Sequence, residues 1–126
     1  MDNNPYAKYK IASATTDNPG QKLLFIFDEV IKTLYQVKKC MEDNDIEGKY
    51  KKLAKLEDVF NTLSMGLDTT VTDDNSKDAI KSLEHFYLLT AAKLADINIH
   101  NKIEEIDVIV DGISNLRSTL TETLHK

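Results

Sequence analysis

A repeating apolar stripe at helical spacing is the feature that most restricts how this chain can fold. Between residues 18 and 45, apolar side chains follow one another in alternating steps of four and three residues, the spacing that lines one face of a helix. The members of this stripe are Leu23, Phe27, Val30, Leu34, Val37 and Met41. Because the 126 residues include only 4 Gly and 2 Pro, little in the chain interrupts long helices.

Three further segments carry the same pattern, each with a capping signal at its start. We expect the second helix to begin at Asn44, with Glu47 three residues later, and the third to begin at Ser76. We expect the fourth helix to begin at Asn101, again with a glutamate, Glu104, three residues later. The apolar stripes of these helices are Ile46, Tyr50, Leu53, Leu56, Phe60, Leu63 and Leu67; then Ile80, Leu83, Tyr87, Leu94 and Ile97; then Ile106, Ile109, Ile113, Leu116, Leu120 and Leu124.

Short polar breaks separate the four segments. A threonine-rich loop covers residues 68–75, and a break at residues 98–100 divides the last two helices. Four helices of about 22 to 26 residues joined by short loops predict an all-α fold, an antiparallel up-down-up-down four-helix bundle. We assign residues 18–126 to this single domain and residues 1–17 to an N-terminal arm or short helix.

Composition narrows the class of function. The chain has 16 Lys and Arg against 21 Asp and Glu, a net charge of -5, so its surface would repel a nucleic-acid backbone. No apolar run approaches the roughly 20 residues of a membrane span, and residues 1–10 are too polar for a signal peptide. The single cysteine fits a reducing compartment. We therefore expect a cytoplasmic protein that binds neither nucleic acid nor membranes.

Side chains that carry catalysis or bind cofactors are sparse. A di-iron carboxylate bundle needs two Glu-x-x-His pairs and two further glutamates, whereas this sequence has one such spacing, Glu122 with His125. Cys40 follows Lys38 and Lys39, whose charges would lower the pKa of its thiol, but it has no recognisable His or Cys partner. We expect a structural thiol, no metal, no cofactor and no enzymatic activity.

A histidine phosphotransfer domain has the same size and acidity. Such a carrier needs an exposed histidine with a nearby cation and a small residue one turn further on. Residues 86–89, which follow His85, are bulky and uncharged. His100 is followed closely by Lys102 but falls in the expected break between helices. Phosphotransfer therefore ranks behind another alternative, a non-catalytic adaptor or dimerising bundle.

Apolar residues outnumber those that one stripe per helix requires, which is about three positions in seven. Residues 23–27 place apolar side chains nearly all round the first helix, and residues 88–89, 97–99 and 108–110 add more to later helices. The excess either widens an ordinary core or packs under the arm, or it forms a groove for an amphipathic partner helix.

Four lysines stand close together early in the second helix: Lys49, Lys51, Lys52 and Lys55. Runs of charge of this kind are usually solvated faces of helices, and we interpret this one in the same way. The alternative is a docking surface for an acidic partner.

Taken in order along the chain, several stretches resemble the flagellar export chaperone family, the FliS-like chaperones that bind flagellin. The stretches that carry the resemblance are Tyr6-Ala7-Lys8-Tyr9, Asn18-Pro19-Gly20-Gln21-Lys22-Leu23-Leu24, Ile26-Phe27-Asp28-Glu29-Val30-Ile31, Leu63-Ser64-Met65-Gly66-Leu67-Asp68, Phe86-Tyr87, Leu94 to Asn98, and Ile106-Asp107-Val108-Ile109. Phe27 stands where the family has Tyr, Glu29 where it has Gly, and Leu120 where Trp is common. The chain therefore resembles a divergent member.

The resemblance implies a cytosolic chaperone that holds the C-terminal segment of new flagellin, prevents premature polymerisation and assists secretion by the type III export machinery. Flagellin would fold into helices over outer apolar grooves of the bundle, which the arm, through Tyr6 and Tyr9, covers until cargo arrives. Leu24 and Phe25 are expected contacts because of the excess apolarity, and Asn98 because of its motif. Other flagellar export or regulatory proteins are further candidate partners.

Overall fold

The structure, a computed structural model, describes residues 19–124, and the side chains as far as residue 123. It contains the four helices α2 (Pro19–Glu42), α3 (Ile46–Met65), α4 (Asp74–His100) and α5 (Glu104–Leu124), with no strand in the described range. The all-α prediction is therefore confirmed. The arm assigned to residues 1–17 lies outside the described residues.

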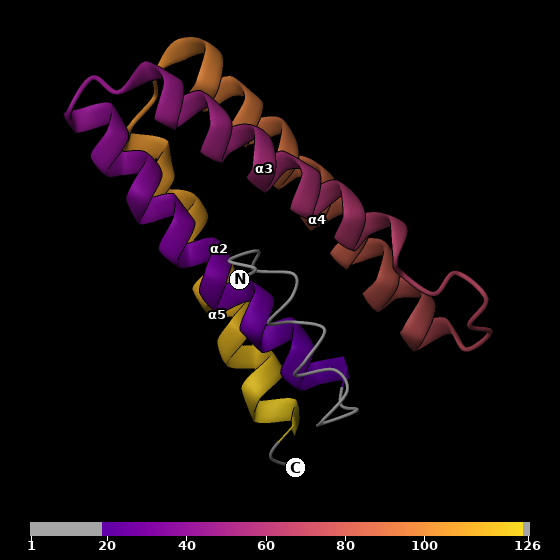
Figure 1. Ribbon diagram of the computed structural model, residues 1–126. Helices are drawn as coiled ribbons and strands as arrows, with labels where there is room; N and C mark the ends of the chain where they lie inside the picture. Colours follow the sequence, from indigo (N-terminus) through magenta and orange to yellow (C-terminus); the bar gives the residue numbers. More distant parts are fainter. Residues whose placement is uncertain (1–18, 125–126) are drawn as a thin grey trace, which may run out of the picture.

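The helices form two antiparallel pairs, α2 with α5 and α3 with α4 (Figure 1). The α2–α3 and α4–α5 contacts join the pairs, and the α4–α5 contact is the sparsest of the four, while the backbones of the diagonal helices do not come close to one another. This arrangement is the predicted up-down-up-down bundle. The two pairs lie closest at the end that carries the α2–α3 and α4–α5 turns, and they diverge toward the other end.

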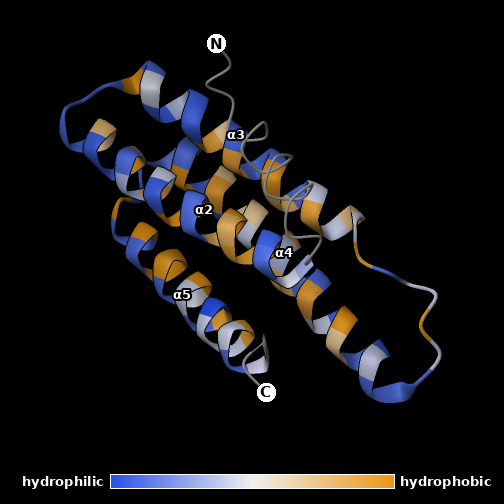
Figure 2. Cartoon of the chain, turned by 60° about the horizontal axis from the view of Figure 1, so that its bottom comes forward, coloured by the Kyte–Doolittle hydropathy of each residue, from blue (hydrophilic) through white to orange (hydrophobic). Residues whose placement is uncertain are grey.

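The predicted stripes supply the core. Along every helix, hydrophobic segments alternate with hydrophilic ones (Figure 2), and the hydrophobic positions meet in one cluster of buried side chains. Its members from α2 and α3 are Phe27, Val30, Leu34, Val37, Leu53, Leu56 and Phe60; those from α4 and α5 are Tyr87, Ala91, Leu94, Ile97, Ile106, Ile109, Val110 and Ile113.

Two members of the predicted α3 stripe are wrong, since Ile46 is 72% exposed and Tyr50 is 62% exposed. The inward position at this end of α3 belongs to Lys49, which is only 7% exposed and lies one step of four residues before the buried Leu53. The buried face of α3 therefore continues through Lys49, and the apolar side chains of Ile46 and Tyr50 face solvent.

The residues that cap the helices differ from those predicted. Asp45, not Asn44, caps α3, and its carboxylate accepts a hydrogen bond from the Gly48 amide at 3.0 Å. Asp73 caps α4 by accepting from the amide of Ser76 at 2.9 Å, so Ser76 is the donor and not the cap. The aspartates take the capping positions because an ionised carboxylate accepts a stronger hydrogen bond from the backbone amides at the positive end of a helix.

Both asparagines that were read as N-caps adopt the left-handed conformation, with φ of 57° at Asn44 and 53° at Asn101. Asparagine tolerates this region, so it ends helices as well as starting them. The predicted break at residues 98–100 is wrong as a result, because α4 continues to His100 and ends at Asn101.

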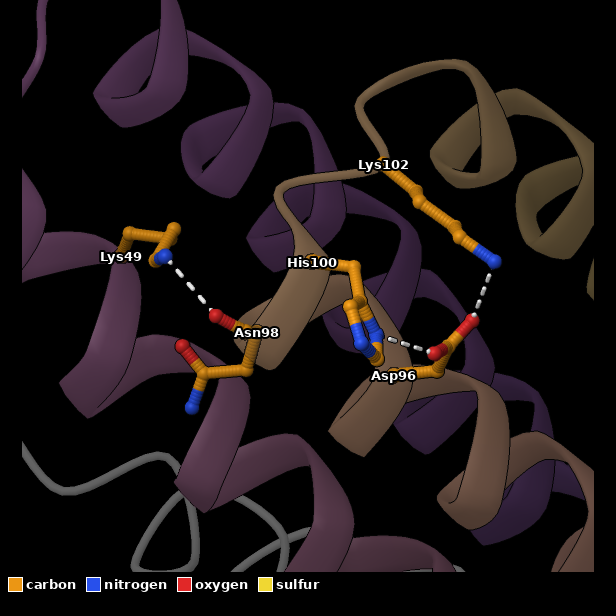
Figure 3. A network of polar contacts seen from close by, with 5 residues as sticks. All are labelled: Lys49, Asp96, Asn98, His100 and Lys102. Carbon is orange, nitrogen blue, oxygen red and sulfur yellow. Dashed lines mark hydrogen bonds and ion pairs between the residues drawn. The ribbon is translucent and has the colours of Figure 1, made fainter.

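A buried lysine ties α3 to the end of α4 (Figure 3). The ammonium of Lys49 donates to the backbone carbonyl of Asn98 at 3.0 Å and to the side-chain oxygen of Asn101 at 2.6 Å. The Asn98 carbonyl is one of the last four of α4, which lack partners within the helix. Beside it, Asp96 bonds Lys102 at 3.0 Å and His100 at 2.7 Å, and these hydrogen bonds lower the pKa of the Asp96 carboxyl.

Cys40 lies in the last turn of α2, where it is buried beside Asp45. Its Sγ lies 3.7 Å from an Asp45 carboxylate oxygen. Burial raises the pKa of the Cys40 thiol, and the charge of Asp45 raises it further. The lowering expected from the neighbouring lysines is thus overturned, and the structural role expected for this thiol fits its surroundings.

The turn at Asn44 can be tested through its backbone alone, because the side chain is exposed. Asn44→Gly should change the free energy of unfolding by less than about 0.5 kcal/mol, since glycine adopts positive φ without penalty. Asn44→Val should lower it by about 1–2 kcal/mol. Urea unfolding followed by circular dichroism measures both. Asn115→Val, at an exposed position within α5, is the control and should change little; an equal loss in the two valine variants would contradict the assignment.

The environment of Cys40 predicts a slow thiol. With an aromatic disulfide reagent at pH 8, Cys40 in the folded protein should react about 100-fold more slowly than in the urea-unfolded chain, because burial removes access and disfavours the thiolate. Absorbance of the released thiolate follows the rate. A folded-state rate equal to the unfolded one would show that the thiol is accessible after all.

Candidate functional site

An apolar groove lies between the first half of α2 and the second half of α3, with a volume of about 410 Å³. We call it the α2–α3 groove. The residues that line it are Leu23, Phe25, Ile26, Glu29, Val30 and Thr33 of α2; Lys55, Leu56, Val59, Thr62 and Leu63 of α3; Gly66 and Leu67, just beyond α3; and Tyr87 of α4. Ten of these fourteen are apolar, counting Gly66 and Tyr87, so the groove suits an apolar ligand surface.

The floor of the α2–α3 groove is the core itself. Val30, Leu56 and Tyr87 are each at most 2% exposed, and they belong to the buried cluster. Burial raises the pKa of the Tyr87 phenol. The walls above this floor include Phe25, Ile26, Val59 and Leu63, all half-buried in the chain on its own. A partner that covers these walls would complete their burial.

The α2–α3 groove follows from the divergence of the two helix pairs. Gln36 and Lys52 mark the narrow end, where the lysine ammonium donates to the glutamine carbonyl at 3.2 Å across the two helices. From there, the lining residues run away from the α2–α3 turn, because α2 and α3 are antiparallel. The lining of the groove therefore runs from Thr33 and Lys55, nearest the turn, to Leu23 and Leu67, farthest from it.

Two charged side chains line the groove, and they lie on opposite walls. Glu29 is half-buried on α2, and Lys55 is exposed on α3. Thr33 donates its hydroxyl hydrogen to the backbone carbonyl of Glu29 at 2.8 Å, so its donor is satisfied within α2.

The predicted contact residues fall in different places. Phe25 lines the α2–α3 groove. Leu24 shares a helix face with Asp28 one turn on, and Asp28 pairs with Arg117 of α5, so Leu24 lies on the α5 side of α2. Asn98 lies near the C-terminal end of α4, where its carbonyl accepts from Lys49. Tyr6 and Tyr9 lie outside the described residues.

The α3 wall of the groove was missed by the sequence reasoning. Val59 and Thr62 lie beside the predicted stripe, and Lys55 was assigned to a solvated run of lysines. The signal that would have found the wall is the apolar pair Val59-Phe60, which widens the stripe of α3 to one side. The run of lysines itself is dispersed: Lys49 is buried, Lys51 pairs with Glu47 in the helix, and Lys52 bonds Gln36.

Apolar side chains also stand outside the groove and the core. Leu88 and Leu89 are 48% and 45% exposed on α4, and Val108 is 51% exposed on α5. Ile99, near the end of α4, is 71% exposed. The prediction that some apolar residues of these segments lie outside the central seam is confirmed.

The side chains considered above for phosphotransfer or metal binding are not arranged for those reactions in the described residues. His100 belongs to the last turn of α4 and its ring is bonded to Asp96, which is an anion and not the cation that a phosphoryl carrier needs. Across residues 19–124, no group of three or more His, Cys, Asp or Glu side chains is arranged to hold a metal ion. Within the same range, every helix is too short or too polar to span a bilayer.

Comparison with known proteins identifies the family. The family model described as "Flagellar protein FliS" matches residues 2–126. The flagellar secretion chaperone FliS of Escherichia coli (strain K12) is 23% identical over 120 residues, which cover 94% of this chain and 86% of that protein. The flagellar secretion chaperone FliS of Bacillus subtilis (strain 168) is 26% identical over 121 residues, which cover 96% of this chain and 86% of that protein.

A solved structure has the same fold. It is described as a crystal structure of a flagellar chaperone from bacteria, and it superposes with a TM-score of 0.80 at 20% sequence identity, covering 97% of this chain and 98% of that one. The family model spans nearly the whole chain, and the sequence identities are low throughout. The chain therefore belongs to the FliS family of flagellar export chaperones, of which it is a divergent member.

Proposed function

We propose that this protein binds the C-terminal segment of flagellin in the cytoplasm, prevents its premature polymerisation and assists its secretion. The observation that carries the proposal is the α2–α3 groove, an open apolar trough of about 410 Å³ whose floor is the core of the bundle. The two relatives named as flagellar secretion chaperones support the class of cargo.

The α2–α3 groove suits an amphipathic helix. Such a helix inserts apolar side chains at steps of three and four residues, and the walls at Phe25, Val59 and Leu63 supply matching apolar surface. Burying that surface contributes about 25 cal/mol per Å². A segment that is disordered before binding loses about 2–5 kcal/mol of this gain to ordering. The ordering cost lowers the affinity for the cargo, so the cargo can be released for export.

The other expected contacts extend the path of the cargo beyond the groove. Asn98 contacts Lys49 of α3, whereas Phe25 lies in the groove with Leu63 of α3. The Asn98 site and the groove are therefore separated along α3 by about 14 residues, from Lys49 to Leu63. At 1.5 Å per residue this is about 20 Å. A cargo segment that reaches both must run along the bundle, and one that also contacts Leu24 must extend to the α5 side of α2.

Tyr6 and Tyr9 give the arm a role in the same proposal. We propose that the arm covers the apolar walls of the α2–α3 groove when no cargo is bound, and that it moves aside for flagellin. In a helical turn, residues three apart lie on one side, so an arm that becomes helical on the groove would place both aromatic side chains against it.

The proposal is tested by co-expression with the C-terminal part of flagellin from the same organism, which should give a stable 1:1 complex in gel filtration. Val59→Glu should weaken the complex at least about 10-fold, because it replaces apolar wall surface with a charged carboxylate that the partner's apolar face would have to desolvate. Titration calorimetry measures the affinity. The matched control is Ile46→Glu, at an exposed apolar position of α3 outside the groove, and it should bind like the unaltered protein.

Three outcomes contradict the proposal in different ways. Absence of binding at micromolar concentrations rejects flagellin as the cargo. Equal loss of binding in the two variants rejects the α2–α3 groove as the site. Self-association with indifference to flagellin supports the adaptor or dimerising bundle in its place.

A further inference from the structure

The outer face of the α3–α4 pair carries apolar side chains that the fold leaves uncovered. In α4, Leu88 is 48% exposed and Ile99 is 71% exposed, and in α3, Tyr50 is 62% exposed. Ala92 is exposed as well, and Ala95 is half-buried. A single exposed apolar side chain needs no explanation, whereas a continuous patch of them marks an interaction surface.

Four of these residues form one stripe along α4. They follow one another in steps of four, three and four residues, so they lie on one face of the helix. This is not the face that the core uses, because the buried residues Tyr87, Ala91 and Leu94 each precede a member of the stripe by one position. We call the set the outer α4 stripe, and its members are Leu88, Ala92, Ala95 and Ile99.

The outer α4 stripe points away from α5, on the side of α4 where α3 lies alongside (Figure 1). The ring of Phe86 lies next to Gly112 of α5, and every member of the stripe is about 180–240° around the helix axis from Phe86. Tyr50 extends the patch onto α3, because its neighbour Lys49 bonds the end of α4 next to Ile99. The α2–α3 groove is lined by none of these residues, so the patch is a separate surface.

The order of side chains in the outer α4 stripe is the same in both directions. A large aliphatic residue stands at each end and an alanine at each of the two middle positions, with symmetric spacing. A twofold axis between Ala92 and Ala95 therefore places Leu88 of one copy opposite Ile99 of the other, and alanine opposite alanine. Such self-complementarity is what a twofold interface between identical chains requires. The alanines let the two helix axes approach to about 8 Å.

The charges beyond the ends of the stripe favour an antiparallel pair. Lys81 lies seven residues before Leu88, on the same line of α4, and is exposed. At the other end of α4, the exposed Glu104 begins α5. Two antiparallel copies bring the lysine of one toward the glutamate end of the other, whereas two parallel copies bring lysine toward lysine.

We infer that the outer α4 stripe is the interface of a weak antiparallel dimer of this chain, with the twofold axis between Ala92 and Ala95. The stripe spans 11 residues, about 16 Å, so the interface falls in the small class below about 1,200 Å² and dissociates on dilution. The inference goes beyond the proposed function, because the α2–α3 groove of each copy stays free for cargo.

Sedimentation velocity of the full chain without cargo tests the association. Raising the protein concentration about 100-fold should move the sedimentation coefficient from that of a monomer toward that of a dimer. Ala92→Glu should weaken this association at least about 10-fold, because it brings a carboxylate to the middle of the apolar contact in both copies. The matched control is Ala79→Glu, the same change at an exposed position of α4 outside the stripe, which should associate like the unaltered protein.

Cross-linking tests the direction of the two helices. An affinity-tagged Leu88→Cys variant, mixed with Ile99→Cys and oxidised, should form a mixed disulfide dimer. Leu88→Cys should not link to itself, because the two copies of this position lie about 16 Å apart along the axis and a disulfide joins Cβ atoms about 4 Å apart. The unaltered chain, whose Cys40 is buried, is the control and should not cross-link.

The outcomes separate this inference from the proposed function. A monomer at every concentration, or association that persists in Ala92→Glu, would overturn the interface. Self-linking of Leu88→Cys in place of the mixed disulfide would overturn the antiparallel arrangement. Ala92→Glu should bind flagellin's C-terminal segment like the unaltered protein, and weaker binding would contradict the separation of the two surfaces. Failure of the unaltered protein to bind flagellin would reject the proposed function and leave the dimer interface standing.

Discussion

The structure depends on how the apolar faces of four helices pack together when hydrogen bonds between helices hold one end of the bundle closed. At the turn end, the buried ammonium of Lys49 ties α3 to the Asn98 carbonyl of α4 and to the side chain of Asn101, and the Lys52–Gln36 bond ties α3 to α2. At the other end, the bidentate pair between Arg117 and Asp28 joins α5 to α2 only. The helices separate at that end, and the groove is the space that results.

The buried faces of the helices were predictable because apolar residues at heptad spacing all lie on one face of a helix, which must be buried. Phe27, Val30, Leu34 and Val37 were expected in the core and are each at most 2% exposed. The helix ends were not predictable to the residue. Asn44 and Asn101 have the side chain of an N-cap, but the same side chain tolerates positive φ, and local sequence does not distinguish the two uses.

The candidate site was predictable on one wall only. The run at residues 23–27 has more apolar side chains than a seam needs, and this excess indicated Phe25. The opposite wall depends on which side of α3 faces α2, and that side is fixed by tertiary contacts. Lys49 and Lys55 are six residues apart in one basic run, yet the first is buried as a tie and the second lines the groove. Their different roles appear only when the neighbouring helices are in place.

We propose that a partner segment binds the walls of the α2–α3 groove. The most direct test is methyl NMR of the protein with flagellin's C-terminal segment added in steps. We expect the methyl resonances of Leu23, Ile26, Val59 and Leu63 to shift, while those of the exposed Ile46, outside the groove, stay in place. Shifts confined to Ile46 and its surroundings, with the four groove residues unchanged, would contradict it.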